Sequence, residues 1–171
     1  MAIVLEQARR KLQRGRDVLV ALCAEVDAAA WRWRPSPGKW SLLEVINHLA
    51  DEERDDFRKR IDLLLHYPGE TWPPIDPQGW VEQRHYNNQD PQASLLRFTD
   101  ERQQSLQWLA TLESPDWQAT YQHASGPLRA GDLLLSWMIH DDLHARQMLR
   151  LHHDRAIATA SPFSAAYAGP W

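Results

Sequence analysis

The chain has 171 residues, of which 43% are hydrophobic and 25% are charged, proportions typical of a folded globular protein and not of a disordered one. Its formal net charge is −4, which disfavours a nucleic-acid partner because such proteins carry clustered basic residues in excess. One cysteine excludes an intrachain disulfide, and no apolar run reaches the ~20 residues of a membrane helix or resembles a signal peptide. We therefore expect one domain over residues 1–171 in the cytoplasm of a bacterial-type cell, with no membrane partner.

An apolar stripe over residues 2–29 predicts the first long helix. Its members follow one another at steps of three and four residues: Leu5, Ala8, Leu12, Gly15, Leu19, Leu22 and Val26. This spacing places them on one face of a helix and is typical of the seam of a helical bundle. The helix must end before the segment that holds Pro35, Pro37 and Gly38, because these residues do not fit within a regular helix.

A second helix is predicted over residues 41–65. Ser41 and Glu44 form the S-x-x-E pattern of a capping box at its start, in which each side chain bonds to the backbone N–H of the other residue. Apolar residues then recur along one face up to residue 65. The charged stretch in the middle, DEERDDFRKR, indicates a face that is mostly solvated.

A long connection is predicted over residues 66–90. Six Pro and Gly residues between positions 68 and 79 exclude a regular helix over its first half. Connections of this length are uncommon in compact domains and are often functional. Its large aromatic residues, Trp72, Trp80 and Tyr86, either cover a cleft or pin the connection to the bundle, and the sequence leaves both interpretations open.

Residues 91–113 predict the third helix and residues 131–151 the fourth. Asp90 suits the N-cap of the third helix and Pro91 its first position. The C-terminal tail has a weak pattern, so we expect it to be irregular. Because no strand-like alternation of useful length is present, the expected fold is all-α, a four-helix bundle. The long loop between helices two and three allows these helices to run parallel, in an up-down-down-up topology.

The fourth helix places two histidines where apolar residues are expected. Its stripe runs through Leu133, Trp137, His140, His144, Gln147 and Leu151. His140 and His144 are four residues apart, so both rings project from one face and two imidazoles can bind one ion. This spacing alone is weak evidence, but His48 on the second helix lies at the edge of its apolar stripe. Three histidines from two facing helices predict a divalent-metal site with open coordination positions.

Carboxylates next to these histidines are candidates for a supporting role. Asp51 and Glu52 follow His48 by three and four residues. Asp141 directly follows His140. Each of these carboxylates either orients a ligand imidazole, binds or deprotonates a metal-bound water, or belongs to a solvated charged face. Asp51, Glu52 or His123 is a candidate for a fourth ligand.

Four other residues carry weaker signals. His123, in the loop before the fourth helix, is the best placed of the remaining histidines to approach the site. Arg102 and Arg146 are candidates to bind a substrate carboxylate, with an ordinary surface ion pair as the alternative. Cys23 lies beside the first apolar stripe and is expected to be a small core residue, not a nucleophile.

Three segments resemble the DinB-like superfamily, which includes YfiT-type metal-dependent hydrolases and bacterial low-molecular-weight-thiol transferases. They are GKWSLLEVINHLADEE, the stretch from RFTDERQ to RAGDLL, and MIHDDLHARQM, which resembles the family's H-D-x-x-H-x-x-Q signature. The resemblance implies an up-down-down-up bundle with a three-histidine metal site at His48, His140 and His144. It also implies zinc or nickel as the usual ion, and commonly a homodimer. It does not imply a single reaction.

Three functional hypotheses follow. The first is a metal-dependent enzyme, a low-molecular-weight-thiol S-transferase or a hydrolase, whose ion activates a thiol or water against a small-molecule substrate. The second is a non-catalytic metal-binding module of the stress response. The third is a bundle whose histidines form a hydrogen-bonded network without metal, which requires two partners for each imidazole. An accessible coordination position beside a cleft favours the first, and a fourth protein ligand favours the second.

Overall fold

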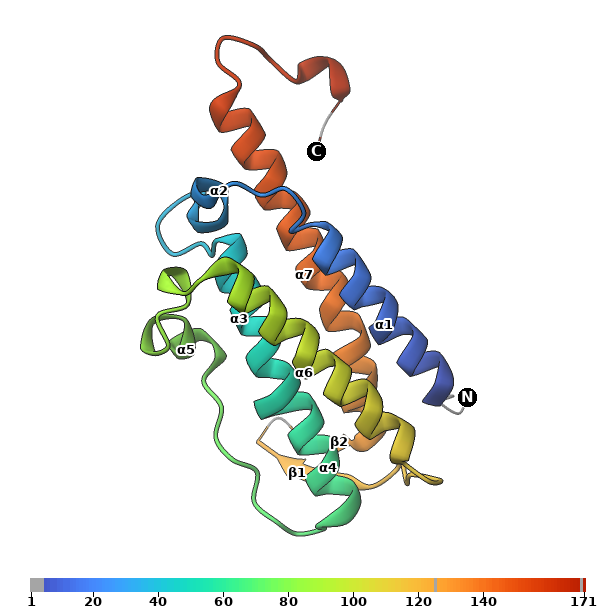
Figure 1. Cartoon of the computed structure of the whole chain (residues 1–171). Helices are drawn as coiled ribbons and strands as arrows, with labels where there is room; N and C mark the ends of the chain where they lie inside the picture. Colours follow the sequence, from blue (N-terminus) through green and yellow to red (C-terminus); the bar gives the residue numbers. More distant parts are fainter. Residues whose placement is uncertain (1–4, 125, 170) are drawn as a thin grey trace.

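The computed structural model describes residues 5–124, 126–169 and 171, and most of these residues are helical. Four long helical segments pack along one another (Figure 1). They are α1 (Leu5–Ala21), α3 (Leu42–Asp51) continued by the π-helical turn η1 (Glu52–Phe57) and α4 (Arg58–His66), α6 (Pro91–Thr111) and α7 (Ala130–Thr159). The predicted all-α four-helix bundle is confirmed. None of the described helices is both long and apolar enough to cross a membrane.

Several short elements connect the long helices. They are α2 (Ala28–Arg32), α5 (Pro77–Gln83), the 3-10 turns η2 (Tyr86–Asn88) and η3 (Ala166–Ala168), and the strands β1 (Thr120–His123) and β2 (Gly126–Arg129). The two strands pair antiparallel as a hairpin directly before α7. The sequence analysis did not predict this hairpin, because four residues per strand are too few to establish an alternating pattern.

The segment α3–α4 runs parallel to α6. Side-chain hydrogen bonds link the two segments in the order Arg97 to Asn47, Arg102 to Glu53, and Trp108 to Asp62. Both partners advance along the chain together, so the two helices point the same way. The long connection between residues 67 and 90 makes this possible, because it returns the chain to the end where α3 begins (Figure 1).

The first and last long helices also run parallel to each other. Their side-chain contacts advance together, from Lys11 with Asp142, to His152 with the backbone of Leu22, to Arg155 with Asp27. Against α3, however, α7 runs in the opposite direction, since His48 lies beside His144 while Phe57 stacks on Trp137. The directions of the four long segments are therefore up, down, down and up.

Two apolar clusters fill the bundle. One is built around Leu12, Ile61, Leu109, Leu134 and Trp137, and the other around Leu19, Leu43, Ile46, Phe98 and Met148. Every residue of α3 is buried, because α2, α5, α6 and α7 all contact this helix. A side chain on α3 is therefore held within the bundle, and this determines the surroundings of His48.

The first helix is shorter than the predicted range of residues 2–29. Residues 2–4 lie outside the described part of the chain, α1 ends at Ala21, and Glu25 adopts a left-handed backbone conformation with φ of 56°. A new helix then begins, because the Asp27 side chain caps it by accepting from the backbone N–H of Ala30 at 2.8 Å. This break allows Trp31 of α2 to be buried against α3.

The second helix begins as predicted, with both capping-box hydrogen bonds between Ser41 and Glu44 present. The connection after it departs from the prediction by containing α5. This helix has Asp76 as N-cap and Pro77 at its first position, a combination that commonly starts helices. The many Pro and Gly residues nearby indicated a loop, so this helix was not predicted. Trp72, Trp80 and Tyr86 of the connection are buried and pin it to the bundle, whereas Tyr67 is exposed.

The fourth helix extends eight residues beyond its predicted end at residue 151, so the predicted irregular tail is wrong over residues 152–159. The last turns have contacts that a sequence pattern does not show. The His152 ring bonds to the backbone carbonyl of Leu22 at 2.7 Å, and Arg155 pairs with Asp27 at 3.1 Å. These contacts with the chain after α1 stabilise turns that carry little apolar periodicity of their own.

Candidate metal centre

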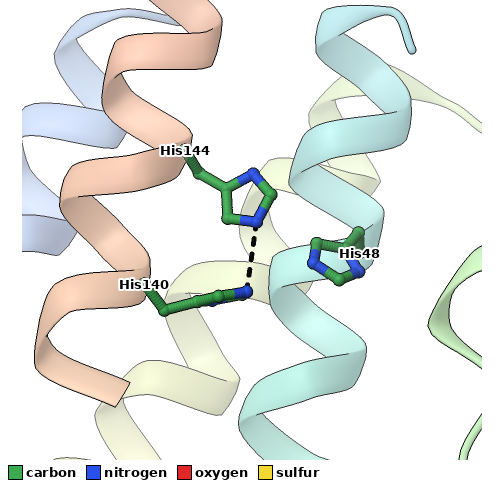
Figure 2. Close-up of side chains that lie close together, drawn as sticks. All are labelled: His48, His140 and His144. Carbon is green, nitrogen blue, oxygen red and sulfur yellow. Dashed lines mark hydrogen bonds between the residues drawn. The ribbon is translucent and has the colours of Figure 1, made fainter. Parts of the chain in front are cut away.

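Three histidines from two helices meet inside the bundle. His48 comes from α3, and His140 and His144 come from α7 (Figure 2). One ligand-type nitrogen of each lies within 4.8 Å of the others, and the Nε2 atoms of His140 and His144 are 3.1 Å apart. His48 is 5% exposed, while the other two are half-buried. The structure thus brings together the three histidines that the sequence singled out.

The local sequence explains why these rings converge. The capping box at Ser41 fixes the start of α3, and His48 follows two helical turns later. On α7, the four-residue spacing stacks His140 and His144 one turn apart on the same face. Because α7 runs antiparallel to α3, this face lies against His48, and the ring centroids of His48 and His144 are 4.8 Å apart.

Burial keeps the three imidazoles neutral. Burial, and then repulsion from the other two histidines, lowers the pKa of His48 to about 2. Burial, and then repulsion from His144 and Arg102, lowers the pKa of His140 to about 3. Burial also lowers the pKa of His144. A neutral imidazole has a free lone pair, which is the form that binds a metal ion.

Gln147 determines which nitrogen of His144 is available. Its amide oxygen Oε1 lies 2.8 Å from Nδ1 of His144, so Nδ1 donates its hydrogen and the lone pair is on Nε2. That Nε2 atom faces His140. The sequence analysis placed Gln147 on the apolar stripe without giving it a role, although the final Q of the H-D-x-x-H-x-x-Q signature was a signal for it. An outer hydrogen bond of this kind is usual for metal-binding histidines.

His48 has one nitrogen without a hydrogen-bond partner in the described part of the chain. Its Nδ1 atom is buried and unbonded, and the nearest carboxylate oxygen, Oε1 of Glu52, lies 4.0 Å away and is also unbonded. Figure 2 shows one ring nitrogen of His48 facing the other two histidines and one facing away. Burial and the neighbouring charge of Asp56 raise the pKa of Glu52 to about 8.

These observations fit a bound divalent ion. Three neutral imidazoles supply three nitrogen donors, a number and type of ligand common to catalytic zinc sites and suited to several other transition metals. Without an ion, the Nε2 atoms of His140 and His144, 3.1 Å apart, share one hydrogen. An ion between the rings would take these lone pairs, and Nδ1 of His48, which faces away, would keep its hydrogen for an outer acceptor. The donor set and its geometry therefore fit an ion.

The other candidate carboxylates lie elsewhere. Asp51 is fully buried and bonds to Arg84 and to the Tyr86 hydroxyl, which ties α5 and η2 to α3. His123, on the hairpin, lies beside Trp72 with ring centroids 6.4 Å apart. Within the described residues, the only group of His, Cys, Asp or Glu with metal-ligand spacing is the set of three histidines. No fourth protein ligand closes the site in this part of the chain.

Arg102 is not a substrate-binding residue. It is fully buried, and its guanidinium bonds to Glu53 at 2.6 Å and to Asp141 at 2.8 Å. It also donates to the backbone carbonyl of Leu12, while the indole N–H of Trp137 donates to the same Glu53 carboxylate. This network joins α1, η1, α6 and α7 next to His140, so Arg102 and Asp141 hold the helices of the site in place. Arg102 and Asp141 are therefore structural residues of the core.

Cys23 agrees with its predicted role. It is 5% exposed in the second apolar cluster, and burial raises the pKa of its thiol to about 12. Because the thiolate is the nucleophilic form, Cys23 is an inert core residue.

A cleft of about 1260 Å³ opens onto the three histidines. Its walls come from the turn before α3, the start of α5, the outer turns of α7 and the C-terminal Trp171. Trp40 lies against the site, with its ring centroid 4.9 Å from that of His48. Arg146 and Lys39 also line the cleft. A small molecule can therefore reach the histidines from solvent.

Solved structures of other proteins share this fold. YfiT from Bacillus subtilis, described as a probable metal-dependent hydrolase with an unusual four-helix bundle topology, superposes with a TM-score of 0.75 at 21% identity, and the match covers 91% of each chain. A mutant of the mycothiol-dependent maleylpyruvate isomerase superposes with a TM-score of 0.69 at 15% identity, over 85% of this chain and 61% of the isomerase. At these identities the likeness shows the fold alone.

The sequence itself identifies the family. Comparison with curated proteins finds no match. The family model of the DinB superfamily, by contrast, matches residues 11–148, a span that includes all three histidines of the site. This chain belongs to the DinB superfamily.

Proposed function

We propose that His48, His140 and His144 bind one divalent metal ion, zinc or nickel, and that the protein is a metal-dependent enzyme acting on a small molecule. The observation that carries the proposal is the convergence of three neutral imidazoles, within 4.8 Å of one another, on a cleft open to solvent. A structural metal site is normally closed by four protein ligands. Three ligands beside a cleft are typical of a site that leaves a position for a reactant.

The reaction is of the thiol S-transferase or hydrolase type. When bound, a divalent ion supplies Lewis-acid chemistry that lowers the pKa of a thiol or a water molecule toward neutrality. The residues of the chain hold and orient the reactants. Gln147 fixes the tautomer of His144, and Trp40 forms an apolar wall of the cleft next to His48. The probable hydrolase activity of YfiT and the mycothiol dependence of the isomerase support these two reaction types.

A non-catalytic metal-binding module of the stress response is the alternative. The cleft is the observation that favours the enzyme, because a storage or sensing site does not require a substrate-sized approach to its ion. The homodimer, the cytoplasmic location and the choice between zinc and nickel stay predictions. Sedimentation equilibrium of the purified chain tests whether it forms a homodimer.

Elemental analysis of purified, tag-free protein tests the metal site. We expect about one equivalent of a transition metal in the wild type and its loss in His48→Ala, His140→Ala and His144→Ala. The matched control is His66→Ala, since His66 is an exposed histidine paired with Asp62 on the outside of α4. If the wild-type protein is folded by circular dichroism but contains no metal after the medium is supplemented with metal ions, the proposal is wrong.

Activity assays separate the enzyme from the alternative. The metal-loaded protein is tested with 4-nitrophenyl acetate for hydrolysis, and with 1-chloro-2,4-dinitrobenzene plus cysteine, glutathione or mycothiol for thiol transfer. We expect one of these reactions to be accelerated in the wild type and in His66→Ala, but not in the three site variants. Full metal occupancy without turnover in any assay would favour the non-catalytic module.

A further inference from the structure

The cleft carries positive charge that the described chain does not fully neutralise. Three basic side chains line it, Lys39 before α3 and Arg146 and Arg150 on α7, together with the carboxyl groups of Glu52 and Asp154. Arg150 pairs with Asp154 at 2.8 Å. Within the described residues, neither Lys39 nor Arg146 has a carboxylate within ion-pair distance. The excess is notable because the chain as a whole has a net charge of −4.

The helical neighbours of Arg146 explain why it stays unpaired. On an α-helix, a basic residue pairs most readily with a carboxylate four positions away. The residue four positions before Arg146 is Asp142, which pairs with Lys11 of α1 instead. The residue four positions after it is Arg150, which carries the same charge. The guanidinium of Arg146 is therefore available to a ligand.

Apolar side chains line the same cleft as Arg146, which is itself exposed. Trp40, Leu143, Leu151 and Trp171 line the same cleft. Leu143 is 48% exposed although it lies one position before a site histidine. Arg146 follows His144 by two residues, so the two side chains leave α7 in different directions, yet both line the same cleft. A molecule that extends across the cleft can therefore contact the histidines, the apolar wall and Arg146.

We propose that the cleft selects a small carboxylate with an apolar body, bound through an ion pair between its carboxylate and Arg146. The inference rests on the proposed function, because it names the class of molecule on which that enzyme acts. The guanidinium presents a planar fork of N–H donors that matches a carboxylate with two parallel hydrogen bonds. Lys39, on the opposite wall, adds a second positive charge. The apolar body packs against Trp40 and Leu143, which places the remainder of the molecule over the three histidines.

Calorimetric titration of the metal-free chain of 171 residues tests this proposal. Chelator-treated protein at low ionic strength is titrated with 4-phenylbutyrate and with the neutral amide of the same shape, 4-phenylbutyramide. We expect the acid to bind about tenfold more tightly than the amide, the usual scale for one charge-assisted hydrogen-bonded pair. Arg146→Ala should remove this preference, and Arg146→Lys should retain part of it.

The matched control is Arg14→Ala. Arg14 is exposed on α1, does not line the cleft, and has no ion pair within the described chain. Its loss should leave the preference for the acid unchanged, whereas raising the salt concentration should weaken binding of the acid alone. Equal binding of acid and amide by the wild type, an undiminished preference in Arg146→Ala, or no binding of the acid would overturn the proposal.

The experiment is independent of the metal. Because the protein is titrated after chelation, a failure of the three histidines to bind an ion would not alter the comparison between acid and amide. Conversely, loss of the carboxylate preference leaves the metal content measured by elemental analysis unaffected. The two proposals therefore fail separately.

Discussion

The Nδ1 atom of His48 and the Oε1 atom of Glu52 lie 4.0 Å apart inside the bundle, and neither has a hydrogen-bond partner among the residues that the structure describes. Two buried, unbonded polar atoms this close are an unusual arrangement. A small rotation of either side chain brings them within hydrogen-bond distance. An ion on the opposite nitrogen of His48 would favour that contact, because it makes the Nδ1–H group a stronger donor.

We therefore predict that Glu52 supports metal binding through His48. Glu52→Ala should weaken the affinity for zinc by about 10- to 100-fold, the usual effect of removing an outer hydrogen-bond partner. Glu52→Gln should retain most of the affinity, because its amide oxygen can still accept from Nδ1. Competition against a chromophoric zinc chelator measures the dissociation constants. Glu70→Ala, at an exposed site, is the control, and an unchanged affinity in Glu52→Ala would refute the role.

The metal-free protein should lose stability in acid. The pKa values of His48 and His140 in the folded state, about 2 and about 3, lie below the ordinary value of 6.5. Below pH 6.5 these two histidines bind protons in the unfolded chain but not in the folded chain. The free energy of unfolding therefore falls as the pH drops below 6.5. The slope reaches about 1.4 kcal/mol per pH unit for each histidine.

Urea denaturation at a series of pH values measures this slope. The Glu52→Gln background is preferable, because the raised pKa of Glu52, about 8, contributes a slope of opposite sign between pH 4.5 and 8. His48→Phe should reduce the acid sensitivity, whereas His66→Ala should not. An equal slope in the wild type and His48→Phe would show that His48 is not held neutral by burial.

Removing Arg102 should destabilise the protein strongly. Arg102→Met leaves the carboxylates of Glu53 and Asp141 buried without their shared cation. Breaking a buried ion pair in this way costs about 3–5 kcal/mol. Urea denaturation measures the loss, with Gln103→Met at the exposed neighbouring position as control. A loss below about 1 kcal/mol, the scale of an exposed pair, would mean that water reaches the network.

Gly15→Ala should destabilise the contact between α1 and α7. A Cβ atom on Gly15 would lie 2.0 Å from Oδ2 and 2.7 Å from Cγ of Asp141, a side chain that Arg102 holds in place. Overpacking of this kind typically costs about 1–3 kcal/mol, which outweighs the gain of about 1 kcal/mol in helix propensity. Thermal unfolding measures the balance, with Gln13→Ala on the same helix as control. A higher melting temperature in Gly15→Ala would contradict the prediction.

The sequence by itself determined the four long helices, though not all of their ends, and it singled out the three histidines that the structure brings together. Periodicity placed Leu12, Leu19 and Trp137 in the core, and it marked His140 and His144 as polar residues on an apolar face. The capping box at Ser41 was equally visible. These signals are local, because the 3.6-residue period and the preferences of helix ends act within a few turns of the chain. These local signals indicated that the three histidines meet, but they did not give the distances between the rings.

Only the tertiary structure decided the partners of the remaining polar residues. Arg102 and Arg146 have the same charge and similar positions on predicted helices, yet one is buried between two carboxylates and the other lines the cleft unpaired. Likewise, Glu52 lies beside His48, whereas Asp51 bonds to residues of the long connection. The physical reason is that an ion pair depends on which faces of distant helices come together. The parallel and antiparallel packing of the bundle determines those faces, and local periodicity does not.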